Sequence, residues 1–151
     1  MWAVDEAHIP AYWFPRQCPR ATFWIGPFTT EADIDWMNGA TRVHLIEWDW
    51  WDRFRTARLW LYRMPPETFA VQDAGAGYYV SRDTVTPLEC VEVDDVLQLH
   101  RSAGIELRIT DDLWPLWDRV VSSTLEFSGI RLRNTRPPLR PSTAYALLPR
   151  R

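Results

Sequence analysis

The chain has 151 residues, of which 46% are hydrophobic and 25% charged, a balance typical of one globular domain with a core of its own. All 17 basic residues are arginine, and the two cysteines, Cys18 and Cys90, lack the CxxC spacing of a zinc or disulfide framework. The net charge is −3, and residues 135–151 hold four arginines and no acid, so the remaining chain carries −7 and offers no basic footprint for nucleic acid.

The N-terminal half predicts short strands separated by short helices. A helix over 6–14 follows Asp5 as its cap and ends at Pro15, and a second over 29–37 is capped by Thr30. Strand 42–48 is apolar on both faces, which favours a central position in a sheet. The other elements expected in this half are strands over 1–4, 20–25 and 57–64 and a helical turn over 49–55.

The C-terminal half predicts strands over 68–71, 78–81, 84–93 and 105–109 and a helix over 94–103 that is capped by Asp94. The longest expected element is a helix that begins at Leu113, with Pro115 in its first turn and apolar residues at helical spacing as far as Leu125. Arg131 and Arg133 suit the negative pole at its other end. Beyond it, residues 135–151 contain four prolines and four arginines, a composition typical of a disordered tail.

These elements predict an α+β fold with a mixed, mainly antiparallel sheet of six or seven short strands, inserted helices and a long C-terminal helix. Most connections between strands are too short for repeated βαβ crossovers. We therefore expect one globular domain over 1–134, followed by the tail over 135–151. The first ten residues have no basic n-region and no apolar h-region, and no stretch is long and apolar enough to span a membrane, so we expect a cytoplasmic protein without a membrane partner.

The segment YWFPRQCPR, residues 12–20, places aromatic rings beside two guanidinium groups. Such a set can hold a nucleotide, since an aromatic ring stacks on the base while arginine forks onto phosphate. The ligand-binding candidates in this segment are Tyr12, Trp13, Arg16 and Arg20. The alternative is that the aromatic rings fill the core and the arginines are solvated.

Two acids are candidates for catalysis. Glu47 opens the segment EWDWWD, where acids among tryptophans are typical of sugar-binding clefts, although Glu47 also falls at a strand end. Glu126 falls inside the predicted long helix, where an exposed acid is the ordinary alternative. The three histidines lie on separate elements without HxH or HExxH spacing, which predicts no metal site.

Several stretches together resemble an uncharacterised bacterial protein family of unknown function. The resemblance covers most of residues 2–134 and implies a family but no reaction. The stretches are Trp2–Asp5, Tyr12–Arg20, Arg42–Trp48, Gly104–Arg108, Leu113–Trp117 and Leu125–Asn134.

A fainter resemblance is to the ADP-ribosyltransferase-like fold, which RNA 2′-phosphotransferases and related NAD-cleaving enzymes share. It rests on the order of Trp2–Asp5, a helix with aromatic residues, Val43–Glu47, a short helix, Leu59–Tyr62 and Tyr78–Ser81. The resemblance implies NAD as cofactor, Tyr12 or Tyr78 as the stacking residue, and Arg16 and Arg20 as phosphate ligands. In those enzymes a strand whose His or Arg grips NAD precedes the segment that here begins at Met1, which implies a truncated or degenerate version.

Three functions follow, and the sequence leaves open whether the protein is an enzyme. In the first, the chain binds a nucleotide or other small anionic ligand through the aromatic and arginine cluster, with no cofactor. In the second, it is an NAD-using enzyme of the ADP-ribosyltransferase type. In the third, it is a non-catalytic protein-interaction module whose contact surface is exposed tryptophans or the tail.

Overall fold

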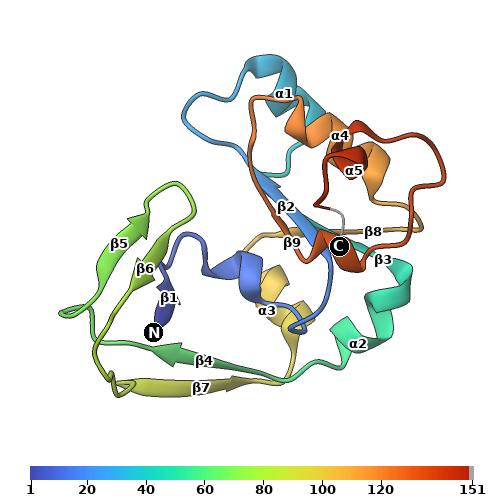
Figure 1. Ribbon diagram of the computed structural model, residues 1–151. Coiled ribbons are helices and arrows are strands. Elements are labelled where there is room, and N and C mark those ends of the chain that lie inside the picture. The colour runs from blue at the N-terminus through green and yellow to red at the C-terminus, as the bar shows by residue number, and fades with distance from the viewer. Residues whose placement is uncertain (150–151) are drawn as a thin grey trace.

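The structure is a computed structural model that describes residues 1–149. Within that range nine strands form three small sheets joined by short helices, which confirms the α+β class but not the single sheet of six or seven strands (Figure 1). The strands are β1 (Trp2–Val4), β2 (Arg20–Trp24), β3 (Arg42–Glu47), β4 (Leu59–Arg63), β5 (Ala70–Asp73), β6 (Tyr78–Val80), β7 (Glu89–Val93), β8 (Glu106–Thr110) and β9 (Glu126–Ile130). The helices are α1 (Glu31–Trp36), α2 (Trp51–Arg55), α3 (Val96–Ser102), α4 (Trp114–Val121) and α5 (Thr143–Ala146), with 3-10 turns η1 (Ile9–Tyr12), η2 (Trp48–Trp50) and η3 (Leu132–Asn134).

The central sheet has the strand order β8-β3-β2-β9. Strand β3 pairs in parallel with β8, while β2 pairs antiparallel with both β3 and β9. Five of the six residues of β3 are buried, which agrees with the central position that its apolar faces predict.

The two faces of the central sheet bury different clusters because side chains alternate along each strand. Ala21 and Phe23 of β2 belong to a core with residues of α4, including Trp114 and Val120. The other cluster, which includes Ile46 of β3, joins the segment after η1 to α2 and α3. The side chain of Arg20 is on this second face and points away from that of Ala21.

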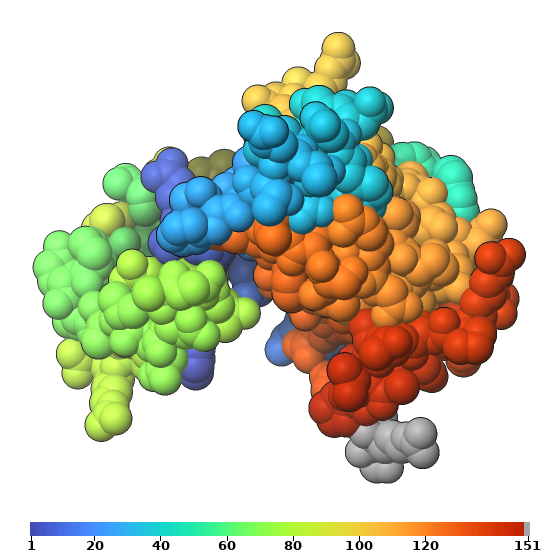
Figure 2. All heavy atoms as spheres, turned by 90° about the horizontal axis from the view of Figure 1, so that it is seen from above, coloured from blue at the N-terminus to red at the C-terminus, as the bar shows by residue number. Residues whose placement is uncertain are grey.

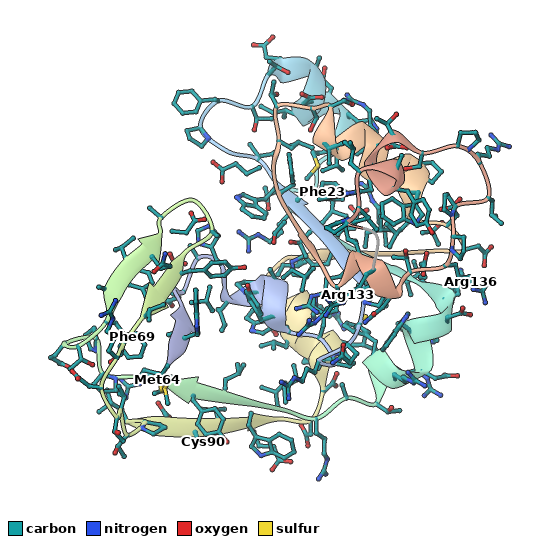
Figure 3. The ribbon with its side chains drawn as sticks, viewed as in Figure 1. Phe23, Met64, Phe69, Cys90, Arg133 and Arg136 are labelled. Atoms are coloured by element: carbon teal, nitrogen blue, oxygen red, sulfur yellow. The ribbon has the colours of Figure 1, made fainter. Side chains whose placement is uncertain are left out.

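The other two sheets lie apart from the central one (Figure 1). One has the order β1-β6-β5, and the other is a ribbon of two strands, β4 and β7. The ribbon carries exposed Trp60 and Tyr62, and Figure 3 labels Cys90 on it. The tryptophans are therefore divided between the surface, as at Trp60, and the core, as at Trp114.

The prediction of a long helix that begins at Leu113 and includes Glu126 is wrong. Helix α4 ends at Val121, and residues 126–130 form β9 instead. The hydroxyl of Ser123 donates to the carbonyl of Val120 at 2.6 Å and accepts from the amide of Leu125 at 3.1 Å. These side-chain bonds compete with helical ones, so the run of hydroxyl residues stops the helix.

The segment that the sequence predicts as a disordered tail lies along α4 over its described part, residues 135–149, which we call the C-terminal strap. The indole nitrogen of Trp114 donates to the carbonyl of Arg136 at 3.1 Å, and the amide of Ala144 donates to Asp118 at 2.8 Å. Tyr145 of α5 packs edge-on against Trp114, with ring centroids 4.9 Å apart. Ala144 and Leu148 extend the core on the α4 side of the sheet.

The structure also differs from two smaller predictions. The helix expected over 6–14 is a single 3-10 turn, Ile9–Tyr12, and the residue whose side chain caps α3 is Asp95 rather than Asp94. None of the helices over residues 1–149 is long and apolar enough to cross a membrane.

Candidate functional site

Arg20 is a buried cation that is held by backbone carbonyls. Its side chain leaves β2 with only 3% of the residue exposed. Nε donates to the carbonyl of Ala11 at 2.9 Å, and Nη1 donates to the carbonyl of Cys18 at 3.0 Å. The guanidinium carbon lies 5.7 Å from the ring centre of Tyr12 and 5.1 Å from that of Phe14. No carboxylate among residues 1–149 forms an ion pair with it.

Tyr12 and Tyr78 meet beside this guanidinium. Their hydroxyl oxygens lie 2.6 Å apart, so the bond links η1 to β6 across 66 residues of sequence. Burial raises the pKa of Tyr12, and the hydrogen bond with Tyr78 raises it further. The phenol of Tyr12 therefore remains a neutral hydrogen-bonding group at ordinary pH.

The electrostatic surroundings of Arg20 leave its charge uncompensated. Burial lowers the pKa of Arg20 to about 10, so the group stays cationic at neutral pH. Burial also raises the pKa of the neighbouring Cys18 thiol to about 12. That thiol is completely buried and remains protonated, so it neither neutralises Arg20 nor serves as a nucleophile.

Arg131 adds a second cation next to Arg20, and the sequence analysis missed it. It directly follows Ile130, the residue of β9 that pairs with Arg20, and its charge contributes to lowering the pKa of Arg20. The backbone of Arg131 is left-handed, with φ of 58°, a conformation that costs a non-glycine residue energy and recurs at functional sites. Nothing in the residue types around position 131 signals this conformation.

A cavity of about 230 Å³ adjoins the cluster (Figure 2). In Figure 2 the yellow-green hairpin of β5 and β6 stands beside the blue and orange body, with a hollow between them. Tyr12 is part of the cavity wall, so the cavity and the Arg20 cluster share a residue. The wall consists of His8, Ala11, Tyr12, Trp24, Asp73, Gly75, Ala76, Phe127 and Ser128.

A second feature of this wall that the sequence analysis missed is the pair of Asp5 and His8. Oδ1 of Asp5 lies 2.7 Å from Nδ1 of His8 and also accepts from the backbone amide of His8 at 2.9 Å. The spacing D-x-x-H just before a turn is a signal for such a contact, because an Asp side chain commonly bonds to residues two or three further on.

The structure separates the other two predicted ligand-binding residues from this cluster. Trp13 is 9% exposed and packs edge-on against His100, with ring centroids 5.7 Å apart, so it belongs to the interior. Arg16 is exposed in the turn that leads to β2. Tyr12, Arg20 and Tyr78 therefore come together, while Trp13 and Arg16 do not join them.

The two candidate catalytic acids have different surroundings. Glu47 is 1% exposed at the end of β3, where Oε2 accepts from the amide of Arg136 at 3.1 Å and burial raises the pKa of the carboxyl. The C-terminal strap covers it. Glu126 lies on β9 rather than in a helix, and its Oε2 accepts from the indole nitrogen of Trp24 at 2.7 Å. Since Trp24 lines the cavity, Glu126 is close to the candidate site.

Other features of the described chain are weaker candidates for a functional site. A larger hollow of about 620 Å³ lies between residues 38–41 and the α3–β8 segment and is wide open to solvent. Within residues 1–149 no three His, Cys, Asp or Glu side chains are grouped so that they could hold a metal ion. The cysteines that the structure describes are free, Cys18 in the interior and Cys90 on the exposed ribbon.

The chain belongs to a family of unknown function, DUF6886, whose model matches residues 1–135. This match confirms the resemblance to an uncharacterised family. It spans the Arg20 cluster, the cavity and Arg131, and ends where the C-terminal strap begins. No curated protein matches the chain, and no solved structure matches it.

Proposed function

We propose that the protein binds a small anionic ligand, of the class of nucleotides and other phosphorylated small molecules, at the cluster of Tyr12, Arg20, Tyr78 and Arg131. The observation that carries this proposal is the guanidinium of Arg20, which is buried without a carboxylate partner among residues 1–149. A buried charge without a counter-charge is costly, and proteins ordinarily pair such groups. A bound anion supplies the missing partner.

The hydrogen bonds of Arg20 suit such a ligand. The two carbonyls occupy Nε–H and one N–H of Nη1, and no acceptor in residues 1–149 takes the N–H groups of Nη2. The carbonyls fix the plane of the guanidinium, so the remaining donors are held in place for a phosphate or carboxylate, which arginine binds through two parallel bonds. Arg131 brings a second positive charge that the same anion neutralises.

The test is calorimetric titration of the full chain with inorganic phosphate, AMP and ADP-ribose. We expect saturable binding that weakens at least about tenfold, or about 1.4 kcal/mol, in Arg20→Gln and in Arg131→Ala. The matched control is Arg16→Ala, which removes an exposed arginine from the same segment and should leave the affinity unchanged. Thermal melting of each variant distinguishes loss of the site from loss of the fold.

Two results would contradict the proposal. One is that none of the three anions binds saturably to the folded wild-type chain. The other is that Arg20→Gln and Arg131→Ala stay folded and bind as the wild type does. Arg131→Ala keeps the test decisive if Arg20→Gln fails to fold, because Arg131 lies nearer the surface.

A second candidate function is NAD cleavage, as the resemblance to ADP-ribosyltransferase-like enzymes implies. The observation in its favour is the carboxylate of Glu126, held at 2.7 Å by the indole of Trp24 at the wall of the cavity. A carboxylate in that place can stabilise the positive charge that develops on a ribose when its glycosidic bond breaks. The measurement is release of nicotinamide from NAD⁺, which Glu126→Gln should abolish while its amide oxygen still accepts from Trp24. The absence of release by the wild-type chain would exclude this function.

A further inference from the structure

Building on the proposed anion site, we infer that the ligand is a small sugar phosphate or polyol phosphate whose hydroxyl groups lie in the 230 Å³ cavity and donate a hydrogen bond to Nε2 of His8. The phosphate then lies at Arg20, and the hydroxyl-bearing part extends past Tyr12. Tyr12 and Ala11 connect the two parts, since both line the cavity while the carbonyl of Ala11 accepts from Arg20.

Asp5 fixes the orientation of the His8 ring. Asp5 accepts from the backbone amide of His8 and lies 2.7 Å from Nδ1, and its own amide donates to the carbonyl of Gly77 at 3.0 Å. The carboxylate accepts a hydrogen bond from Nδ1 and so keeps the ring hydrogen on that nitrogen, as carboxylates beside functional histidines commonly do. In its neutral form the ring therefore offers Nε2 as a hydrogen-bond acceptor, and His8 is part of the cavity wall.

The β5–β6 turn packs closely against Asp5 and His8. Gly77 has φ of +65°, and a Cβ atom placed there would lie 2.7 Å from Oδ2 of Asp5 and closer still to Nδ1 of His8. The position thus requires glycine both for its backbone and for the close approach. The contact of Gly77 with Asp5 and His8 holds the turn in place, so that Gly75 and Ala76 form one wall of the cavity.

The cavity wall is partly polar. Besides His8 the wall contains two polar residues, Asp73 and Ser128, and Oδ1 of Asp73 accepts from the amide of Ala76 at 3.1 Å. No arginine is part of the wall. A carboxylate and a hydroxyl side chain without an arginine favour the hydroxyl groups of a ligand over its phosphate, which belongs at Arg20.

The volume of the cavity limits the size of the ligand. A cavity of about 230 Å³ is smaller than the roughly 300–1,000 Å³ of pockets that enclose drug-sized ligands. It can take a pentose or hexose but not a whole dinucleotide. The same reasoning allows the ribose phosphate part of a larger nucleotide, with the base outside the cavity.

The experiment compares ribose 5-phosphate with inorganic phosphate by calorimetry on the full chain. We expect ribose 5-phosphate to bind at least about tenfold more tightly, because the sugar adds hydrogen bonds that phosphate lacks. In His8→Asn the side-chain amide replaces Nδ1–H and keeps a donor for Asp5, but Nε2 is gone. That variant should bind inorganic phosphate as the wild type does and lose the tenfold preference.

Further variants separate the possible failures. Arg20→Gln should weaken both ligands, whereas His8→Asn should weaken ribose 5-phosphate alone. Equal binding of the two ligands by the wild type, or an unchanged preference in His8→Asn, would overturn this inference and leave the anion site standing. Unchanged binding of both ligands in folded Arg20→Gln would overturn the proposed function itself. His8→Gln, whose amide reaches the place of Nε2, should recover part of the preference, and a merely structural role for His8 predicts no such recovery.

Discussion

Arg131 combines a strained backbone with a place next to Arg20, and the two properties can be separated by substitution. Its φ of 58° costs an arginine energy that glycine does not pay. We expect Arg131→Gly to leave the free energy of unfolding unchanged or to raise it by up to about 1 kcal/mol, since relief of strain offsets the greater freedom of the unfolded chain. Affinity for phosphate should fall in the same variant, and urea unfolding and phosphate titration measure the two effects.

The matched control for this prediction is Asn38→Gly. Asn38 also has a left-handed backbone, with φ of 54°, but it lies in the turn after α1. Its replacement should leave phosphate affinity unchanged. A loss of stability above about 1 kcal/mol in Arg131→Gly would contradict the prediction, because it would show that the contacts of the Arg131 side chain contribute more to stability than its backbone strain removes.

His44 and His100 form a buried pair on the face of the central sheet that also carries Arg20. Nδ1 of His44 lies 2.9 Å from Nε2 of His100, whose Nδ1 donates to the carbonyl of Val96 at 2.7 Å. Burial lowers the pKa of both rings, and for His44 the neighbouring His100 adds to the effect. The fold thus holds neutral histidines that the unfolded chain protonates below about pH 6.5.

Stability should therefore be fully present above about pH 6.5 and fall as the pH drops below it, by about 1.4 kcal/mol per pH unit for each histidine kept neutral. Urea midpoints between pH 8 and pH 5 measure this slope. His44→Leu removes one titrating group, so its slope should be shallower whatever its stability at pH 8. Parallel pH profiles for the wild type and His44→Leu would refute the prediction.

The candidate site was partly predictable at this scale. A run of aromatic and arginine residues pointed to Tyr12 and Arg20, and both lie in the cluster. Sequence proximity could not tell that Arg16 is exposed in a turn while Arg20 enters a strand and turns inward. His8 is three residues from Asp5, so their contact is local, but whether the pair faces a cavity depends on a turn some 70 residues away.

Among the secondary-structure elements, strands with a strong local signal agree with the structure, whereas the cap of α3 and the boundary after α4 do not. Helical and strand periods overlap over residues 121–126, so apolar spacing alone could not locate the end of the helix. The three-sheet arrangement depends on pairings between distant residues, such as Trp2 with Val80. Propensity carries no information about such partners, whereas the apolar character of both faces of β3 is local and made its central position predictable.

The C-terminal strap makes most of its polar contacts through backbone groups. The amide of Arg136 donates to Glu47 and the amide of Leu139 donates to Asp112. The guanidinium of Arg136 donates to the carboxylate of Asp49, an exposed residue of η2 (Figure 3). Arg136→Ala keeps the amide that serves Glu47 and loses an exposed ion pair, which is worth at most about 1 kcal/mol. Arg136→Ala should therefore lower the free energy of unfolding by at most about 1 kcal/mol.

Deletion of residues 136–149 should cost far more, roughly 3 kcal/mol or above. It leaves the buried carboxyl of Glu47 without the amide of Arg136 and removes the packing of Tyr145 on Trp114. Urea unfolding of the two variants beside the wild type measures the difference. Equal stability of the deletion variant and the wild type would mean that the strap does not stabilise the body.

For the whole molecule, the two faces of the central sheet rely on different polar groups. The face that carries Arg20 buries the histidine pair, whereas on the other side Asp33 of α1 joins α1 to the segment after α4. The carboxylate of Asp33 accepts from Nη2 of Arg119 at 2.7 Å, from the hydroxyl of Thr124 at 2.6 Å and from the amide of Thr124 at 2.8 Å. The two faces should therefore lose their contributions to folding stability in different pH ranges.

Hydrogen bonds from Thr124, with that of Arg119, lower the pKa of Asp33 below its ordinary value. Its contribution to stability is therefore present above about pH 4 and is lost as the pH falls below that value, after the histidine pair has already lowered stability between about pH 6.5 and pH 5. Asp33→Asn should be less stable at neutral pH, keep the decline attributed to the histidines, and show a smaller further loss below pH 4. Chemical unfolding from pH 8 to pH 2 distinguishes the two ranges. If Asp33→Asn lost as much stability below pH 4 as the wild type does, the acid sensitivity of the α1–α4 face would have to come from other carboxylates.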